Sequence, residues 1–175
     1  ALHCPLGLAT FACGALTWLL TLLRDRPAAR ATLGEISWGV VALTAVLFVV
    51  VGALDGAGGI AAGRALFAWS AHVPHPLSAL TVGFAGAVAS NAINNLPVAL
   101  SLGESLHASP VPDLASAAAL VGVNVGPNAT LHGSLATLLW LRIVRRAEIA
   151  VSPWAFLRVG ALCAVPALAA ALLAL

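Results

Sequence analysis

The sequence predicts an all-α integral membrane protein that contains a re-entrant helical hairpin and a discontinuous transmembrane helix. Apolar residues make up 61% of the 175 residues and charged residues only 8%, whereas a soluble domain carries about 25% charged residues. The apolar runs are roughly 20 residues long, which suits membrane-spanning helices better than the shorter alternating strands of a membrane barrel. Two polar interruptions within these runs predict the hairpin and the broken helix.

Five apolar segments follow one another along the chain. They cover residues 1–23, 36–54, 76–107, 114–141 and 153–175. Trp38, at the start of the second segment, is expected to anchor that helix at the membrane interface. The arginines gather mainly in two connections, residues 24–30 and 142–152, which we expect to be basic loops.

The other connections are short. Residues 64–71 are expected to form a short interfacial helix, after a glycine-rich stretch that ends the second segment. Residues 109–113 have the composition of a turn, and Asp113 is a suitable N-cap for the fourth segment. Pro166 is expected to kink the fifth segment.

The third segment is interrupted by three asparagines, a serine and a proline within residues 89–97, which read ASNAINNLP. In hydrocarbon every backbone polar group needs a partner, so such a break is tolerated only where it is buried in protein or lines a wet cavity. Pro97 removes one backbone donor. The asparagine amides can replace lost backbone partners, or they can offer donors and acceptors to a ligand.

The fourth segment carries a second break of the same kind. Residues 124–130 read NVGPNAT, and His132, Gly133 and Ser134 follow shortly after. A pair of hydrophobic segments interrupted by Gly, Pro and polar residues is the best sequence indication of a transporter's binding site. We therefore expect the solute to bind where these two breaks meet.

The predicted binding residues all lie in the two breaks. They are Ser90, Asn91, Asn94, Asn95, Gly126, Pro127, Asn128, Thr130 and Ser134. A structural alternative stays open for each kind: the asparagines could only satisfy the broken backbone, Gly126 and Pro127 could form a simple kink, and the hydroxyls could serve helix packing.

Two ionisable residues are candidates for proton coupling. His132 lies two residues past the second break, and an ionisable side chain at membrane depth is a functional hypothesis by default. Asp55 follows the second segment. The alternative for His132 is a neutral side chain that lines a cavity.

We predict no metal site and no cofactor. His72 and His75 flank a proline in a loop, which indicates a turn. The cysteines Cys4, Cys13 and Cys163 lie apart within apolar segments, where they act as small hydrophobic residues; a thiolate site for a soft metalloid is the alternative. The chain lacks a phosphate-binding loop and a metalloprotease motif, so we expect no enzyme. Its net charge of +2 is too small for nucleic-acid binding.

The arginines favour a re-entrant third segment. If that segment crossed the membrane, the two basic loops would fall on opposite sides and the positive-inside asymmetry would vanish. If it enters and leaves by one face, seven of the eight arginines lie on one side and only Arg64 on the other. As a helix, the 14 residues 76–89 would also extend only about 21 Å, less than the ~30 Å hydrocarbon core.

The two breaks resemble those of a known family. Residues 90–97, 126–130 and 133–141 are similar to the C-terminal half of arsenical pump membrane proteins, the ArsB-type arsenite permeases. The resemblance covers essentially the whole chain, and the run GSLATLLWL is specific for the arsenite branch of the ion-transporter superfamily. It implies a fold of two inverted repeats, each with a re-entrant hairpin and a helix unwound at mid-membrane. The chain departs from the expected pattern at Leu131 and His132 and in the position of Asp55.

The resemblance also implies a function. It suggests one inverted-repeat half of an arsenite and antimonite efflux transporter in a bacterial inner membrane, driven by proton antiport or by a partner ATPase. Residues 1–73 would then be scaffold-type helices and residues 74–175 the transport-type unit, and the N-terminal half of the same transporter would be a further partner. The alternatives are a sodium/proton antiporter, an organic-anion transporter of the same superfamily, or a non-transporting membrane fragment.

Overall fold

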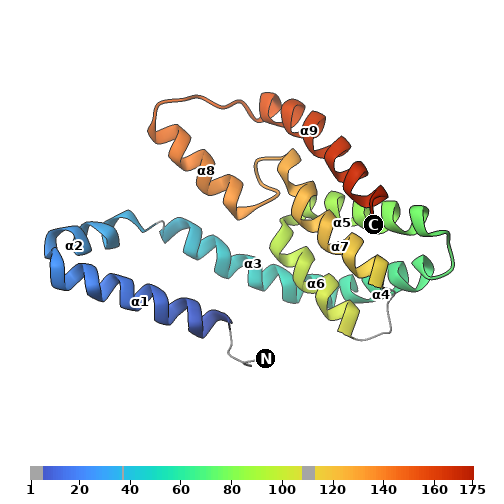
Figure 1. The fold of residues 1–175 in the computed structure, drawn as a ribbon, viewed down its shortest axis with the longest axis horizontal. Helices are drawn as coiled ribbons and strands as arrows, with labels where there is room; N and C mark the ends of the chain where they lie inside the picture. Colours follow the sequence, from blue (N-terminus) through green and yellow to red (C-terminus); the bar gives the residue numbers. More distant parts are fainter. Residues whose placement is uncertain (1–5, 37, 108–112) are drawn as a thin grey trace. The chain divides into compact units, whose positions relative to one another are not determined.

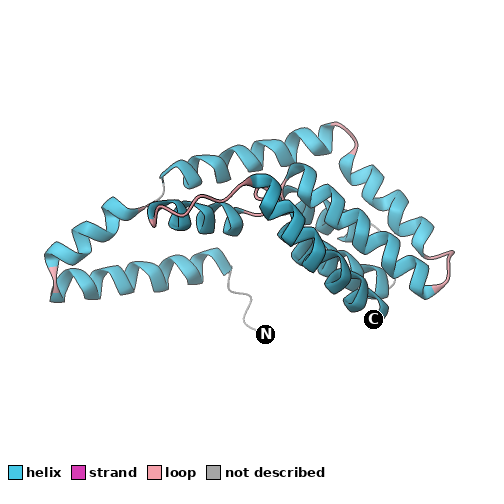
Figure 2. Ribbon diagram, turned by 90° about the horizontal axis from the view of Figure 1, so that it is seen from above, coloured by secondary structure: helices cyan, strands magenta, loops and turns pink. Residues whose placement is uncertain are grey.

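The computed structural model describes residues 6–36, 38–107 and 113–175, and every regular element in them is helical. Figures 1 and 2 show these helices joined by short loops. By its internal contacts the chain forms two compact units, residues 1–41 and 42–175, with the boundary inside α3 (Trp38–Gly56). The predicted turn at residues 109–112 and Cys4 lie outside the described residues.

The first unit is built around the pair α1 (Leu6–Arg24) and α2 (Arg26–Glu35). The indole nitrogen of Trp18 donates to the carbonyl oxygen of Ala29 at 3.2 Å and ties the two helices together. Residues 24–30 were expected to be a loop, but α2 begins at Arg26. The cause is local: Asp25 caps the helix by accepting the Ala28 N–H at 3.1 Å, and Pro27 occupies a first-turn position that suits it.

The second unit continues with α4 (Gly59–Ser70), which begins five residues earlier than the interfacial helix expected at 64–71. Gly58, at φ 90°, makes the turn between α3 and α4. Phe67 on α4 is buried in the core of the unit, and Trp69 stays partly exposed. The helix therefore packs on the protein as well as presenting an aromatic side chain outward.

The two expected breaks interrupt the helices in the rest of the unit. The first break separates α5 (His75–Ile93) from α6 (Asn95–His107). The second lies between α7 (Asp113–Val125) and α8 (Leu135–Arg146), where a 3₁₀ turn, η1 (Gly126–Ala129), is followed by a non-helical connection, residues 130–134. Residues 142–146 were expected in a loop but complete α8. The chain ends in α9 (Pro153–Leu173), which includes Pro166.

The first break in the helix covers fewer residues than the sequence indicates. We expected the helix to stop near Ala89, but α5 continues to Ile93 and is 19 residues long. Its length is therefore about 28 Å at 1.5 Å per residue, close to the thickness of a membrane core. The length argument for a re-entrant segment was wrong, because serine and asparagine continue the helix until Asn94.

Small side chains let α5 and α7 pack closely in the core of the second unit. A Cβ placed on Gly122 of α7 would clash with the carbonyl oxygen of Gly83 on α5, so the two backbones touch there. Small interfacial residues are the usual means of close helix packing in membranes. The buried cluster around this contact consists of Phe67, Ala79, Val82, Ala87, Ala115, Ala118, Ala119, Leu168 and Leu172.

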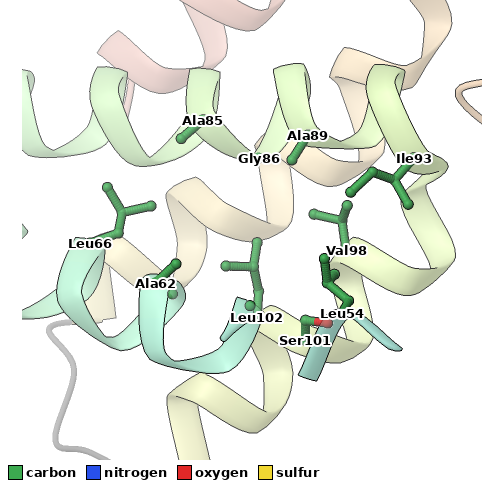
Figure 3. Close-up of a pocket in the computed structure, with 12 residues that line it drawn as sticks. Leu54, Ala62, Leu66, Ala85, Gly86, Ala89, Ile93, Val98, Ser101 and Leu102 are labelled. Atoms are coloured by element: carbon green, nitrogen blue, oxygen red, sulfur yellow. The ribbon is translucent and has the colours of Figure 1, made fainter. Parts of the chain in front are cut away.

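Where α5 and α6 diverge, they enclose an apolar hollow together with α4 and the end of α3. It has a volume of about 220 Å³ and is shown in Figure 3. Ala85 and Ala89 of α5, Ala62 of α4 and Leu102 of α6 point into it. The hollow therefore lies between α5 and α6, close to the turn that joins them.

Four of the described helices are long and apolar enough to cross a membrane: residues Gly7–Arg24, Trp38–Gly56, His75–Ile93 and Pro153–Leu173. The first of these buries none of its residues and the second only 6% within the described structure. Such exposure of apolar surface is expected for helices that face lipid or further protein.

Candidate functional site

The two polar breaks meet in the structure, where hydrogen bonds join them in two places. The first link is made by Asn91, near the end of α5. Its side-chain Nδ2 donates to the carbonyl oxygen of Ala87 at 2.9 Å and to that of Gly126 at 2.7 Å. Its Oδ1 accepts the hydroxyl of Thr130 at 2.8 Å. Asn91 thus binds both ends of the η1 turn.

The second link is made by the turn between α5 and α6. The side-chain Nδ2 of Asn94 donates to the carbonyl oxygen of His132 at 2.9 Å, while its Oδ1 accepts the backbone N–H of Leu96 at 3.2 Å. The backbone N–H of Asn95 donates to the carbonyl oxygen of Gly133 at 2.9 Å. The second link therefore joins the turn between α5 and α6 to the connection that precedes α8.

Gly133 is required by the closeness of this contact. A Cβ at this position would lie 2.6 Å from the carbonyl oxygen of Pro127 and 3.0 Å from Oδ1 of Asn91. The first distance is below any ordinary contact, so the connection before α8 can approach the first link only because residue 133 has no side chain. Together the links form one continuous hydrogen-bonded junction between residues that are more than 30 positions apart in sequence.

The remaining predicted binding residues lie in or beside this junction. Ser90 is fully buried, and its hydroxyl has no hydrogen-bond partner among the described residues. Asn128 is exposed and donates to the carbonyl oxygens of Asn124 and Val125. Ser134 caps α8 by accepting the N–H of Ala136 at 3.1 Å. Pro127 is buried within η1.

The two candidates for proton coupling differ in position. His132 has an exposed side chain, and its backbone carbonyl belongs to the second link. Asp55 is exposed near the end of α3, and within the described residues its carboxylate makes no hydrogen bond or ion pair with the junction. The structure thus places His132 at the site and leaves Asp55 outside it.

A cavity of about 260 Å³ adjoins the first link, between α5, η1 and α9. Asn91 and Thr130 supply its polar edge, while Phe84, Val88 and Leu157 contribute apolar walls. One water molecule needs about 10–15 Å³ of such volume, so the cavity has room for a small solute.

The sequence did not single out Ser101, on α6. Its hydroxyl is buried without a hydrogen-bond partner among the described residues, and its side chain lines the hollow of Figure 3. An isolated serine in an apolar segment gives no signal that separates this position from its neighbours. Of the cysteines, Cys13 and Cys163 are exposed and free, and in the described part of the chain no three His, Cys, Asp or Glu residues gather as metal ligands.

Few charged residues occur in the part of the chain that forms the junction. The sequence contains no Arg or Lys between Ser70 and Leu141, and Glu104 and Asp113 are the acidic residues in that range. Glu104 is exposed on α6, and Asp113 begins α7. The polar groups that meet at the two breaks are therefore neutral amides, hydroxyls and backbone groups, to which His132 contributes its carbonyl oxygen.

The chain is similar in sequence to known membrane proteins. The family model described as "Arsenical pump membrane protein" matches residues 10–175. The arsenical pump membrane protein of Escherichia coli strain K12 is 34% identical over 100 residues, which make up 55% of this chain and 23% of that protein. The protein of the same name from Yersinia enterocolitica is 34% identical over 97 residues, or 53% of this chain and 23% of its own length.

The aligned part of the chain thus spans about a quarter of the length of these relatives. No solved structure matches the chain. Because the family model covers far more than half of the 175 residues, and because four helices are long and apolar enough to span a membrane, the chain is a multi-pass membrane protein that belongs to the arsenical pump membrane protein family.

Proposed function

We propose that this chain supplies one half of the solute pathway of an arsenite and antimonite efflux transporter in a bacterial inner membrane. The observation that carries the proposal is the junction of two polar helix breaks, built from neutral hydrogen-bonding groups in an otherwise apolar chain. Family membership supports the substrate class. The binding residues are drawn from Ser90, Asn91, Asn94, Asn95, Gly126, Pro127, Asn128, Thr130 and Ser134.

The chemistry of the junction favours a small solute that is uncharged when it binds. Carboxylates and phosphates are usually held by Arg, Lys or helix N-termini, and this part of the chain has no Arg or Lys. Arsenite is a weak acid that is neutral at physiological pH and presents three hydroxyls. Each hydroxyl can donate and accept, which matches amides, hydroxyl side chains and free backbone groups.

The energy source is also a proposal. His132 is the better candidate for coupling to protons, because its backbone belongs to the junction whereas Asp55 lies apart. An ATPase that binds the transporter would be the other source of energy. The N-terminal half of the same transporter is expected to provide the facing half of the solute site, which would complete the hydrogen-bonding shell around the solute.

Competition measurements in everted membrane vesicles test the substrate class. The vesicles contain the protein that is expressed from the complete reading frame encoding this chain, and uptake of radiolabelled arsenite is measured. We expect antimonite to compete, and succinate, phosphate and arsenate not to compete. His132→Gln should weaken the dependence of uptake on the proton gradient, and Asp55→Asn is the matched control that should leave it unchanged.

Other outcomes would assign the chain differently. Strong inhibition by succinate would indicate an organic-anion transporter, and a strict sodium requirement without arsenite movement would indicate a sodium/proton antiporter. Absence of any solute movement from correctly inserted protein would indicate a membrane fragment without transport activity.

A further inference from the structure

The three asparagines of the first break differ in how much of their hydrogen-bonding capacity is already used. Asn91 is saturated as a donor, because both of its amide hydrogens are matched by carbonyl oxygens, those of Ala87 and Gly126. Its oxygen also accepts from Thr130. A solute could bind this amide only by displacing bonds that hold the η1 turn.

Asn94 is in a similar state. Its side chain bonds to the carbonyl oxygen of His132 and to the N–H of Leu96, and the residue is only 3% exposed. A solute cannot reach this amide unless the turn between α5 and α6 first separates from the chain before α8. Both Asn91 and Asn94 therefore have their polar groups committed inside the protein.

Asn95 has the opposite combination. Its backbone is fixed, because the N–H donates to Gly133 at 2.9 Å. Its side chain is half-buried and has no hydrogen-bond partner within the described part of the chain. Asn95 therefore combines a backbone that is fixed at the junction with side-chain donors and acceptors that remain free, as a ligand-binding group requires.

We infer that Asn95 contacts the solute directly, and that Asn91 and Asn94 are positioning residues that hold the α5–α6 turn against the second break so that Asn95 is presented correctly. The inference rests on the proposed function, since it divides the roles within the same site. It assigns the binding contact to the residue whose amide is free, and it assigns the two amides that are bonded across the breaks to the geometry of the junction.

The test is a set of variants in the complete transporter, measured as initial rates of arsenite uptake in everted vesicles. Asn95→Ala should raise KM about fivefold to tenfold, the loss of one hydrogen bond, with little change in Vmax or thermal midpoint. Asn91→Ala should raise KM less and lower the thermal midpoint. Thr130→Val removes one bond of this link, the one from the Thr130 hydroxyl to Asn91, and should change KM and the thermal midpoint in the same directions as Asn91→Ala but by less. Thr130→Ser retains the hydroxyl and should resemble wild type.

A double variant separates positioning from direct contact. If Asn91 acts through Asn95, the KM of Asn91→Ala/Asn95→Ala should equal that of Asn95→Ala alone. If the two effects on KM multiply, Asn91 touches the solute independently and the division of roles is wrong. An unchanged KM for Asn95→Ala would also overturn the inference.

The thermal midpoints distinguish this failure from failure of the proposed function. If the wild-type transporter moves no arsenite, the proposed function fails, and the contact assigned to Asn95 fails with it. The junction is then judged by the thermal midpoints alone. Asn91→Ala should lower the midpoint, Thr130→Val should lower it by less, and Thr130→Ser and Asn95→Ala should leave it unchanged. Any other pattern would contradict the positioning role.

Discussion

Asn94 combines an unfavourable backbone conformation with a side chain that bridges the two breaks. Its φ is 112° and its ψ 148°, a region that residues other than glycine rarely adopt. Such strain costs about 1–3 kcal/mol and persists only where the surroundings enforce it. Here the side-chain bonds to His132 and Leu96 hold the residue in place, so the turn between α5 and α6 depends on contacts that are distant in sequence.

Substitutions at Asn94 should separate these two contributions. Asn94→Ala loses both side-chain bonds and keeps the backbone strain, so it should lower the free energy of unfolding by about 2 kcal/mol or more. Asn94→Gly loses the same bonds but relieves the strain and should be the less destabilised of the two. Thermal unfolding of the purified transporter in detergent measures the difference.

The control is Asn124→Ala, because Asn124 is exposed and its amide bonds only to the Leu120 carbonyl one turn earlier. This variant should unfold close to the wild-type temperature. If Asn94→Gly were less stable than Asn94→Ala, the positive φ would not be a source of strain, and the account of the turn would be incorrect.

At the scale of secondary-structure elements, the second unit depends on the contact of α5 with α7. Replacing Gly122 by Ala would push a methyl group into the Gly83 carbonyl, and overpacking of this kind typically costs about 1–3 kcal/mol. We expect Gly122→Ala to lower the thermal midpoint and the yield of monodisperse protein. Because α5 and α7 carry the two breaks, arsenite uptake should fall with it.

Gly103→Ala provides the matched control on α6. A Cβ at residue 103 meets no atom within 4 Å, and alanine favours helix over glycine by up to about 1 kcal/mol. This variant should be as stable as wild type or slightly more stable. Equal losses in both variants would show that the helices tolerate any added methyl group poorly, and would remove the special role of the α5–α7 contact.

The sequence predicted the elements better than it predicted their contacts. Hydrophobic runs located the long helices, and Pro and Asn residues located both breaks, because these signals act within a few neighbouring residues. The end of α5 was placed too early, since Ser90 and Asn91 are compatible with a helix whose asparagine finds partners at Gly126 and Thr130. Those partners are 35 and 39 positions away, and local patterns carry no information about them.

The same reasoning explains the difference among the asparagines. All three looked like equal ligand candidates in the sequence, because each amide offers the same donors and acceptors. Only the fold decides that Asn91 and Asn94 are occupied and that the Asn95 side chain is not. The division of the chain into scaffold-type residues 1–73 and transport-type residues 74–175 concerns motion and stays a prediction.

At the scale of the whole molecule, the membrane topology depends on how α5 and α6 are inserted. α5 is 19 residues long, about 28 Å, and could cross the membrane. α6 has 13 residues, only about 20 Å, and could not cross a ~30 Å core by itself. Length alone therefore does not separate a re-entrant hairpin from a crossing segment, and the distribution of arginines becomes the deciding argument.

We expect α5 and α6 to enter and leave by the outer face. That insertion places seven arginines on the cytoplasmic side and leaves Arg64 outside, as the positive-inside rule requires. The seven are Arg24, Arg26, Arg30, Arg142, Arg145, Arg146 and Arg158. Any insertion in which the pair crosses the membrane divides these residues between the two sides and removes the asymmetry.

Single cysteines at exposed positions on either side of the α5–α6 pair test this topology. His72 precedes α5, Asp113 follows α6, and Ala147 follows α8; all three are exposed. In the complete transporter with Cys4, Cys13 and Cys163 replaced, His72→Cys and Asp113→Cys should both react with a membrane-impermeant thiol reagent in intact spheroplasts. Ala147→Cys should react only in everted vesicles. Labelling of positions 72 and 113 from opposite sides would show that the pair crosses the membrane, and the arginines would then have to be distributed against the positive-inside rule.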